Sequence, residues 1–287
     1  MILTATAVGL FCRDNESEFF APWRSTASVT VRRSRRQCMT APFEADMTAL
    51  PLALRYKLLT ALVVPRPIAL VTSVGPDGIV NAAPFSFFNV FSEDPALVVL
   101  GLQARPDGTP KDTLKHVRET GAFVVNLVDE AMADRMNVCS VDFPSNISEV
   151  EAAGFGILPG VAVPVPRVAE APVALECRHY MTLEVTFRRH LCIGMVVVHL
   201  HARPGIIDPE RLRVNFDAYK PVARLFGNFY ARLGEKFVLK RQSFAEWQAD
   251  TGADALRQDE SLIASKSPAL AEDNDALFCA PANPVHE

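Results

Sequence analysis

The sequence predicts a mainly β fold, namely a closed antiparallel β-barrel with short helices inserted between its strands. The first reason is that the middle of the chain contains many apolar, β-branched segments bounded by turn residues. The second is that strands and helices do not alternate regularly, as they would in a doubly wound nucleotide-binding fold. The 287 residues are enough for one large domain or two ordinary ones.

The predicted strands begin with a hairpin. Residues 67–74 and 79–83 form its two strands, and the sequence GPDG at 75–78 between them is a turn signal. Pro84 lacks a backbone donor, so we expect strand pairing to end there. Four further strands are predicted on the same grounds, the last two as one long hairpin: 96–102, 122–128, 173–188 and 192–203.

Three short helices are predicted between these strands. Residues 111–120 form the clearest one, because Gly121 follows directly and glycine commonly ends a helix in the left-handed conformation. Residues 131–138 and 147–153 are expected to form the other two.

The N-terminal segment differs from the middle of the chain. We expect residues 1–46 to be a disordered extension, or a segment that precedes the true start of the protein. Its basic run at 32–36 has neither a helical nor a strand period, and the apolar opening lacks the positive region of a signal peptide. The true first residue is then Met1, Met39 or Met47, and the sequence does not decide among them.

Residues 47–250 are expected to form the folded domain, and 251–287, rich in Asp, Glu, Ala and Pro, a flexible tail. The chain has 29 Lys and Arg against 33 Asp and Glu, a net charge of −4, so it is a poor candidate for nucleic-acid binding. Its apolar stretches are shorter than the roughly 20 residues of a membrane helix. Six scattered cysteines without a CxxC pair are typical of a cytoplasmic protein.

The first cluster with chemical potential is NAAPFSFFN at 81–89. It supplies the hydroxyl of Ser86, the amide of Asn89, backbone N–H groups and three phenyl rings. A flat heteroaromatic ligand needs this mixture, since its faces require apolar contacts and its polar edge requires donors. The alternative is a phenylalanine-rich plug of the barrel, which composition alone favours.

The second cluster is the sequence PKDT at 110–113. Asp112 or Thr113 is well placed to cap the helix that follows, and Lys111 adds a positive charge beside it. Free N–H groups at a helix start, a lysine and a hydroxyl together suit an anion such as a phosphate monoester. Simple capping with an exposed lysine is the alternative.

The third cluster joins PRP at 65–67 to the end of the first strand. Arg66 is either a bidentate phosphate clamp or a surface charge, and its two flanking prolines stiffen the backbone. Thr72 and Ser73 lie near the hairpin turn, where their hydroxyls can line a ligand or satisfy turn amides.

Other sites are excluded by their patterns. His199 and His201 share one face of a predicted strand, but two ligands are too few for zinc, and His179 helps only in a suitable register, so we predict no metal site. The motifs GxGxxG, GxxxxGK[ST], GxSxG and HExxH are all missing. Cys139 and Cys177 are better explained as inert core thiols than as nucleophiles, so no catalytic residue is assigned.

The order of the three clusters says more than any one of them. The series PRPIALVTS, NAAPFSFFN, EDPALVVLGL and KDTLKHVRETGAFVVNLV, between residues 65 and 128, resembles the flavin reductase-like, FMN-binding split-barrel family. Within that family the sequence is most similar to the branch of flavoredoxin-type proteins and of the reductase components of two-component monooxygenases. The resemblance runs from about residue 56 to about residue 230.

The resemblance implies a six-stranded split barrel that forms a homodimer and binds FMN, or alternatively FAD, near the dimer interface. It places Thr72 and Ser73 along the ribityl-phosphate chain. The residues expected to hold the phosphate are Lys111, Asp112 and Thr113, and those expected at the ring are Ser86, Phe87 and Asn89, with Phe85 beside them and Arg66 as an additional candidate.

The function implied is that of an NAD(P)H-dependent flavin reductase, in which NADH or NADPH delivers hydride to the flavin. Reduced FMN would then serve a partner monooxygenase. One alternative is an electron-transfer flavoprotein that binds FMN tightly and is reduced by a protein partner. Another is a barrel of the same superfamily that no longer binds flavin.

Overall fold

The structure is a computed structural model that describes residues 42–249, except Pro106 and residues 187–188. The chain divides into two units, with the boundary between Arg55 and Tyr56. The described part of the first unit contains a turn in which the Asp46 carboxylate accepts a hydrogen bond from the Thr48 amide, at 2.8 Å. Most of the predicted extension at 1–46 and the whole predicted tail lie outside the described residues.

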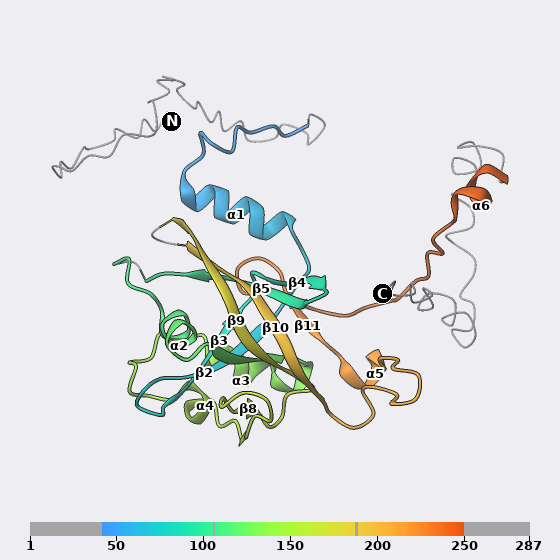
Figure 1. The fold of residues 1–287 in the computed structure, drawn as a ribbon. Coiled ribbons are helices and arrows are strands. Elements are labelled where there is room, and N and C mark those ends of the chain that lie inside the picture. Colours follow the sequence, from blue (N-terminus) through green and yellow to red (C-terminus); the bar gives the residue numbers. More distant parts are fainter. Residues whose placement is uncertain (1–41, 106, 187–188, 250–287) are drawn as a thin grey trace, which may run out of the picture. The chain divides into compact units, whose positions relative to one another are not determined.

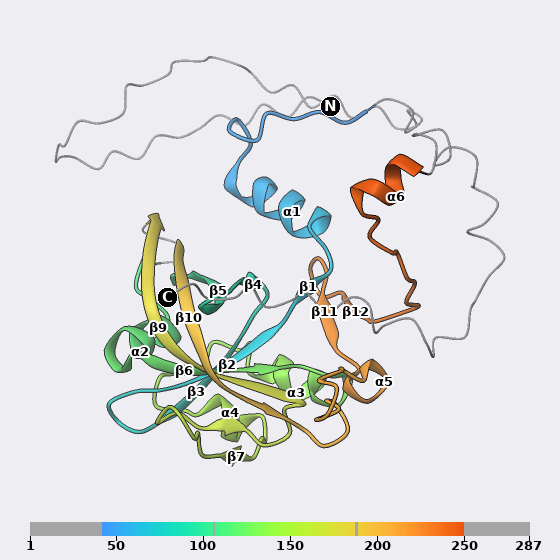
Figure 2. The same ribbon diagram turned by 45° about the vertical axis from the view of Figure 1, so that its right-hand side comes forward.

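In the second unit, seven of the described strands form one antiparallel sheet, in the order β3-β2-β6-β9-β10-β5-β4. The strands are β2 (Ala69–Val74), β3 (Val80–Phe85), β4 (Phe88–Glu93), β5 (Ala96–Gln103), β6 (Ala122–Leu127), β9 (Val173–Thr186) and β10 (Arg189–Ala202). In both Figures 1 and 2, the long β9–β10 hairpin runs at a steep angle to β2 and β3.

The sheet curls into a split barrel because its two edge strands are consecutive in the chain. Strands β3 and β4 lie at opposite edges, yet only Ser86 and Phe87 separate them. The chain therefore crosses from one edge to the other at residues 85–88, which we call the seam. The Gly101 amide of β5 donates a hydrogen bond to the Phe87 carbonyl at 2.7 Å and holds the seam in place.

The inside of the barrel is an apolar core. Ala69 of β2 and Leu100 of β5 belong to the same buried cluster, although three strands lie between β2 and β5 in the sheet order. Helix α2 (Asp112–Thr120) contributes Leu114 and Val117 to this cluster. Because Gly121 adopts φ 70°, the helix ends there and the chain enters β6, as predicted.

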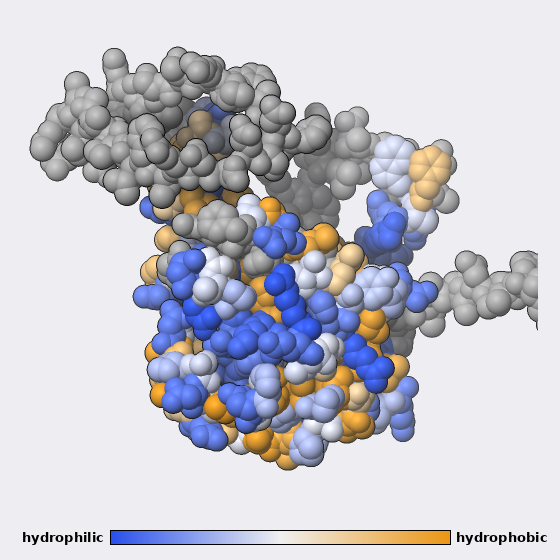
Figure 3. All heavy atoms as spheres, turned by 60° about the vertical axis from the view of Figure 1, so that its left-hand side comes forward, coloured by the Kyte–Doolittle hydropathy of each residue, from blue (hydrophilic) through white to orange (hydrophobic). Residues whose placement is uncertain are grey.

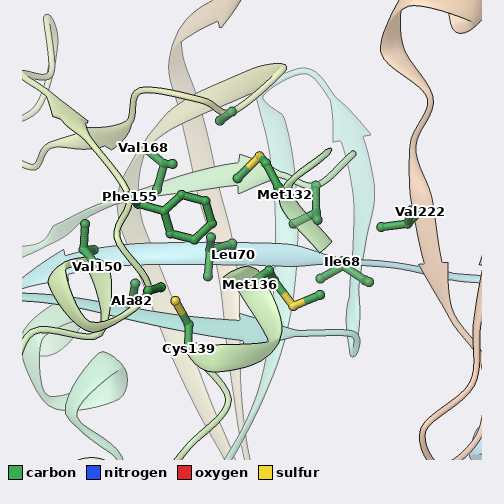
Figure 4. Close-up of a cluster of buried hydrophobic side chains, with 13 residues drawn as sticks. Ile68, Leu70, Ala82, Met132, Met136, Cys139, Val150, Phe155, Val168 and Val222 are labelled. Carbon is green, nitrogen blue, oxygen red and sulfur yellow. The ribbon is translucent and has the colours of Figure 1, made fainter. Parts of the chain in front are cut away.

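A second apolar cluster covers the outer face of β2 and β3. Figure 4 shows the Phe155 ring beside Leu70, with Met132 and Met136 nearby. The covering elements are η1 (Glu130–Met132), α3 (Ala133–Val138) and α4 (Glu149–Ala152). Strand β2 is therefore buried on both faces, and its residues from Ala69 to Ser73 are all fully buried.

The remaining described elements are short. A small sheet has the order β1 (Arg66–Pro67), β11 (Val222–Arg224) and β12 (Tyr230–Arg232), and β7 (Ile157–Leu158) pairs with β8 (Arg167–Val168). The helices are α1 (Leu52–Leu62), α5 (Phe216–Tyr219) and α6 (Phe244–Ala249). In Figure 3, hydrophilic side chains dominate the middle of one face. Among the described residues, no helix has both the length and the apolar character to cross a membrane.

The mainly β fold with short helices is confirmed, with three differences. The main sheet has seven strands rather than six, because Phe88–Glu93 forms a strand that was not predicted. Helix α1 was not predicted either. The expectation for Pro84 was wrong, since β3 pairs with β2 through Phe85, and Pro84 lies opposite Leu70. Proline is tolerated there because β3 is an edge strand.

Candidate functional site

Two joined grooves lie at the seam. The first, which we call the polar groove, holds about 540 Å³ of free space, part of it open to solvent, and is lined by Asn81, Ala83, Pro84, Phe85, Arg105, Lys111, Asp112, Thr113, Cys139, Ser140, Val141, Asp142, Phe143 and Glu149. The second, the aromatic groove, holds about 530 Å³ and is lined by Tyr56, Pro84, Phe85, Ser86, Phe87, Gly101, Gln103 and Lys111. Because they share Pro84, Phe85 and Lys111, one extended ligand can occupy both.

The polar groove contains the start of helix α2. Lys111 occupies the N-cap position with extended φ and ψ, and none of the described side chains caps the helix. The expectation that Asp112 or Thr113 caps it was therefore wrong. Lysine is unfavourable at an N-cap position, because its positive charge is repelled by the positive end of the helix dipole. First-turn amides have no partner within a helix, so this start suits an anion.

A second cation, Arg105, fixes the orientation of Asp112. The Arg105 guanidinium donates to the Asp112 carboxylate at 2.7 Å and to the Pro110 carbonyl at 2.6 Å. The sequence prediction did not select Arg105, although its position just after a buried strand and close to the PKDT cluster is a usable signal.

Two further carboxylates line the polar groove. Asp142 forms an exposed ion pair with Lys111, with 3.2 Å between the charged atoms. Glu149 accepts a hydrogen bond from the Ala82 amide at 3.0 Å, and burial raises the pKa of its carboxyl group. No local pattern in the sequence marks either residue, because both reach the groove from a loop and a helix that fold over β3.

Beneath the polar groove lies a buried hydrogen-bond network. The Asn81 side-chain amide donates to Thr113 Oγ1 at 3.0 Å and to Ser73 Oγ at 3.4 Å. Ser73 Oγ is also 3.2 Å from His116 Nδ1. Ser73, Asn81 and Thr113 are all buried, so the predicted residue Ser73 supports the groove from below, whereas Thr113 lines it.

Thr72, predicted to lie along the ligand, lines neither groove. Its side chain is fully buried, and its hydroxyl donates to the Pro166 carbonyl at 2.7 Å and accepts from the Asn126 amide at 3.2 Å. Thr72 thus ties β2 and β6 to the segment before β8.

Arg66, predicted as a candidate phosphate ligand, is also buried and lines neither groove. Its guanidinium donates to the backbone carbonyls of Thr60, Val63 and Leu225, and its Nε lies 3.5 Å from Ser86 Oγ. Burial lowers the pKa of this group. Arg66 therefore joins the end of α1, the residue after β11 and the seam.

The aromatic groove brings together Phe85, Ser86 and Phe87, as predicted from their sequence cluster. The Phe87 ring centroid is 6.3 Å from that of Tyr56, which the sequence prediction did not select. Asn89, predicted at the ring, is exposed on β4 and lines neither groove, and its side-chain Oδ1 accepts a hydrogen bond from the Val90 amide at 2.9 Å.

Comparison with known proteins identifies the family. The family model described as "Flavin reductase like domain" matches residues 61–223. An uncharacterized protein of Deinococcus radiodurans is 40% identical over 208 residues, which cover 71% of this chain and 91% of the relative.

Two solved structures are similar in sequence and in fold. The 2-nitrobenzoate 2-nitroreductase NbaA of Pseudomonas fluorescens is 41% identical, with a TM-score of 0.65, and the match covers 70% of this chain and 98% of that one. Component B of the nitrilotriacetate monooxygenase of Bacillus cereus is 34% identical, with a TM-score of 0.66, and the match covers 70% of this chain and 100% of that one. The chain therefore belongs to the flavin reductase-like family, as the order of its motifs predicted, and its function is that of a flavoprotein oxidoreductase.

Proposed function

We propose that the protein is an NAD(P)H-dependent flavin reductase that holds FMN across the two joined grooves. The observation that carries this proposal is the start of helix α2. Lys111 occupies the N-cap without a side-chain cap among the described residues, and it borders both the polar and the aromatic groove. FMN has the matching composition, with a phosphate at one end and a flat ring at the other.

The residues present fit both ends of FMN. The first-turn amides of α2, Lys111 and Thr113 would hold the phosphate, which would compete with Asp142 for Lys111. Asp142 is 92% exposed, so its displacement costs little. Phe85 and Phe87 would contact the faces of the ring, and Ser86 would offer a donor to its polar edge. Bound flavin supplies the hydride chemistry, and the chain supplies binding and orientation.

The oligomeric state proposed is a homodimer. Val90 and Phe91 on the edge strand β4 are 67% and 69% exposed, and they border an apolar hollow with Leu97 and Val197. An exposed apolar edge strand invites pairing with another chain. Light scattering of the purified protein should give twice the mass of one chain, and the mass of a single chain would contradict this part.

Two candidate functions differ in the electron acceptor. Similarity to a monooxygenase component B favours delivery of reduced FMN to a partner oxygenase. Similarity to a 2-nitrobenzoate 2-nitroreductase favours direct reduction of a nitroaromatic acid. We propose the first as the main function and the second as the alternative; both relatives match over nearly their whole length.

The test measures the oxidation of NADH or NADPH by the purified protein, which is monitored as a loss of absorbance. Oxidation that requires added FMN supports the flavin reductase. Oxidation that requires 2-nitrobenzoate, with FMN retained on the protein, supports the nitroreductase. Protein that retains FMN but oxidises neither nucleotide is an electron carrier reduced by a protein partner, and this result would contradict the proposal.

A further inference from the structure

The buried network beneath the polar groove ends on a titratable side chain, His116. Helix α2 carries both Thr113, which lines the groove, and His116, which lies one turn further on and is half-buried. Ser73 of β2 and Asn81 of β3 connect the two, through contacts of 3.2, 3.4 and 3.0 Å. The protonation of His116 is thus linked by hydrogen bonds to a hydroxyl in the groove.

The contacts define a direction along this network. Both hydrogens of the Asn81 amide are donated, one to Ser73 Oγ and one to Thr113 Oγ1. Ser73 can then donate its own hydrogen to His116 Nδ1, provided that this nitrogen carries no proton. Because Thr113 Oγ1 accepts from Asn81, the Thr113 hydrogen is available to point into the polar groove.

The surroundings of His116 favour the required tautomer. A Cβ at Gly75 would lie 2.7 Å from His116 Nε2 and 2.9 Å from Asp77 Oδ1, so the Nε2 side of the ring faces the turn that carries this carboxylate. A proton on Nε2 suits that position and leaves Nδ1 as the acceptor. The charged groups that act on the ring are Asp112, Lys115 and Glu119 of α2 and Asp77 of the turn. Burial, together with Lys115, outweighs the three carboxylates and lowers the pKa of His116.

We infer that His116 is a positioning residue for the anionic end of the ligand. While its Nδ1 is unprotonated, Ser73 and Asn81 are oriented so that Thr113 donates a hydrogen bond into the polar groove. Protonated His116 instead donates to Ser73, the Asn81 amide turns over to accept from Ser73 and Thr113, and the groove loses this donor. The inference rests on the proposed function, because it takes the FMN phosphate as the anion.

This mechanism and simple electrostatics predict opposite changes of FMN affinity as the pH falls. A positive charge on His116 would by itself attract the phosphate, so FMN affinity would rise as the pH falls. Reversal of the network predicts that affinity falls. Titration of the phosphate itself, with a pKa near 6, affects every variant alike and therefore cancels in a comparison between variants.

The test is the dissociation constant of FMN, measured by flavin fluorescence quenching from about pH 8 to about pH 5, for wild type and His116→Asn. Asparagine keeps an acceptor near Nδ1 but does not titrate. We expect the wild-type dissociation constant to rise about three- to tenfold more than that of the variant at low pH, which corresponds to one neutral hydrogen bond. His179→Asn, whose ring contacts Thr182 at 2.7 Å, is the matched control and should titrate like wild type.

Two further measurements do not depend on the folding of His116→Asn. Thr113→Val should lose the part of the pH response that exceeds titration of the phosphate, and Thr113→Ser should keep it. Nitrogen NMR of the histidine rings in the wild-type protein should show an unprotonated Nδ1 for His116 at neutral pH. Equal pH profiles, or a protonated Nδ1, would overturn the inference while FMN still binds. If FMN fails to bind at any pH, the proposed function fails, and the inference with it.

Discussion

The ammonium group of Lys111 lies 3.2 Å from the carboxylate of Asp142, and both side chains line the polar groove. Lys111 is also the N-cap of helix α2, where a positive side chain is electrostatically unfavourable. In the absence of an anionic ligand, Asp142 partly offsets this charge. A phosphate bound at the helix start would take the place of Asp142, so loss of the Lys111–Asp142 ion pair would indicate that phosphate is bound there.

Removing Lys111 should weaken FMN binding. Lys111→Ala is expected to cost about 1.5–3 kcal/mol of binding free energy, the usual value of a hydrogen bond to a charged group. Fluorescence quenching titrations measure this loss. Lys115→Ala, on the same helix and exposed, is the matched control for charge and should bind like wild type. Equal FMN affinities of Lys111→Ala and wild type would show that the phosphate does not bind beside Lys111.

Removing Asp142 should have the opposite effect. Asp142→Asn leaves Lys111 without its competing carboxylate, so FMN affinity should rise about two- to fivefold, in keeping with an exposed ion pair. The gain should shrink in high salt, since exposed charges are screened. Glu151→Gln makes the same change of net charge at another exposed position and serves as the control. An equal gain in both variants would show that only net charge matters.

The aromatic groove depends on a close approach between Gly101 and Phe87. A Cβ at Gly101 would lie 2.9 Å from Phe87 Cβ, so Gly101→Ala must displace the seam. We expect a loss of about 1–3 kcal/mol in the free energy of unfolding and a weaker affinity for FMN. Gly234→Ala is the control, because a Cβ there meets no described atom within 4 Å. Urea unfolding and FMN titration of both variants test the contact, and unchanged behaviour of Gly101→Ala would refute it.

A stability prediction concerns Glu176, a fully buried carboxylate. It accepts hydrogen bonds from the amides of Val161, Ala162 and Val163 and from His201, at 2.6–2.9 Å. Burial alone would raise the pKa of Glu176, but these hydrogen bonds outweigh burial and lower it from 4.5 to about 2. Because the pKa of Glu176 is lower in the folded protein than in the unfolded chain, the ionised carboxylate stabilises the fold at pH values above about 4.5. This stabilisation is lost as the pH falls from about 4.5 to about 2.

Glu176→Gln should therefore be less stable than wild type at neutral pH by about 2–3 kcal/mol, and the gap should close as the pH falls through that range. Urea unfolding of both proteins at several pH values measures the gap. A gap that stays constant down to about pH 2 would mean that Glu176 is not stabilised as a carboxylate.

The fold, and the clustering of Phe85, Ser86 and Phe87 in one groove, could be predicted from the sequence, but the roles of several other residues could not. The apolar, β-branched run before the turn signal locates β2 but does not tell which of Thr72 and Ser73 faces a ligand, because β2 is buried on both faces. The sequence leaves Arg66 as either a phosphate clamp or a surface charge, and only the folded chain brings three backbone carbonyls to its guanidinium. Asp142 and Glu149 reach the groove through tertiary packing, which leaves no local signal.

The polar groove also shows where helix rules mislead. A serine, threonine or aspartate near a helix start normally predicts a cap, and Asp112 and Thr113 fit that rule. In the structure Asp112 pairs with Arg105 and Thr113 with Asn81, so both side chains are used elsewhere. The uncapped start is a feature of the tertiary structure, and it is the feature on which the proposed phosphate site depends.

We propose above all that FMN lies across both grooves with its phosphate at the start of α2. A crystal structure of the protein with FMN tests it most directly. We expect phosphate density beside Lys111 and the first-turn amides, and ring density along Phe85 and Phe87, with Asp142 no longer paired to Lys111. Phosphate density at any other place, or an intact Lys111–Asp142 pair beneath bound FMN, would contradict it.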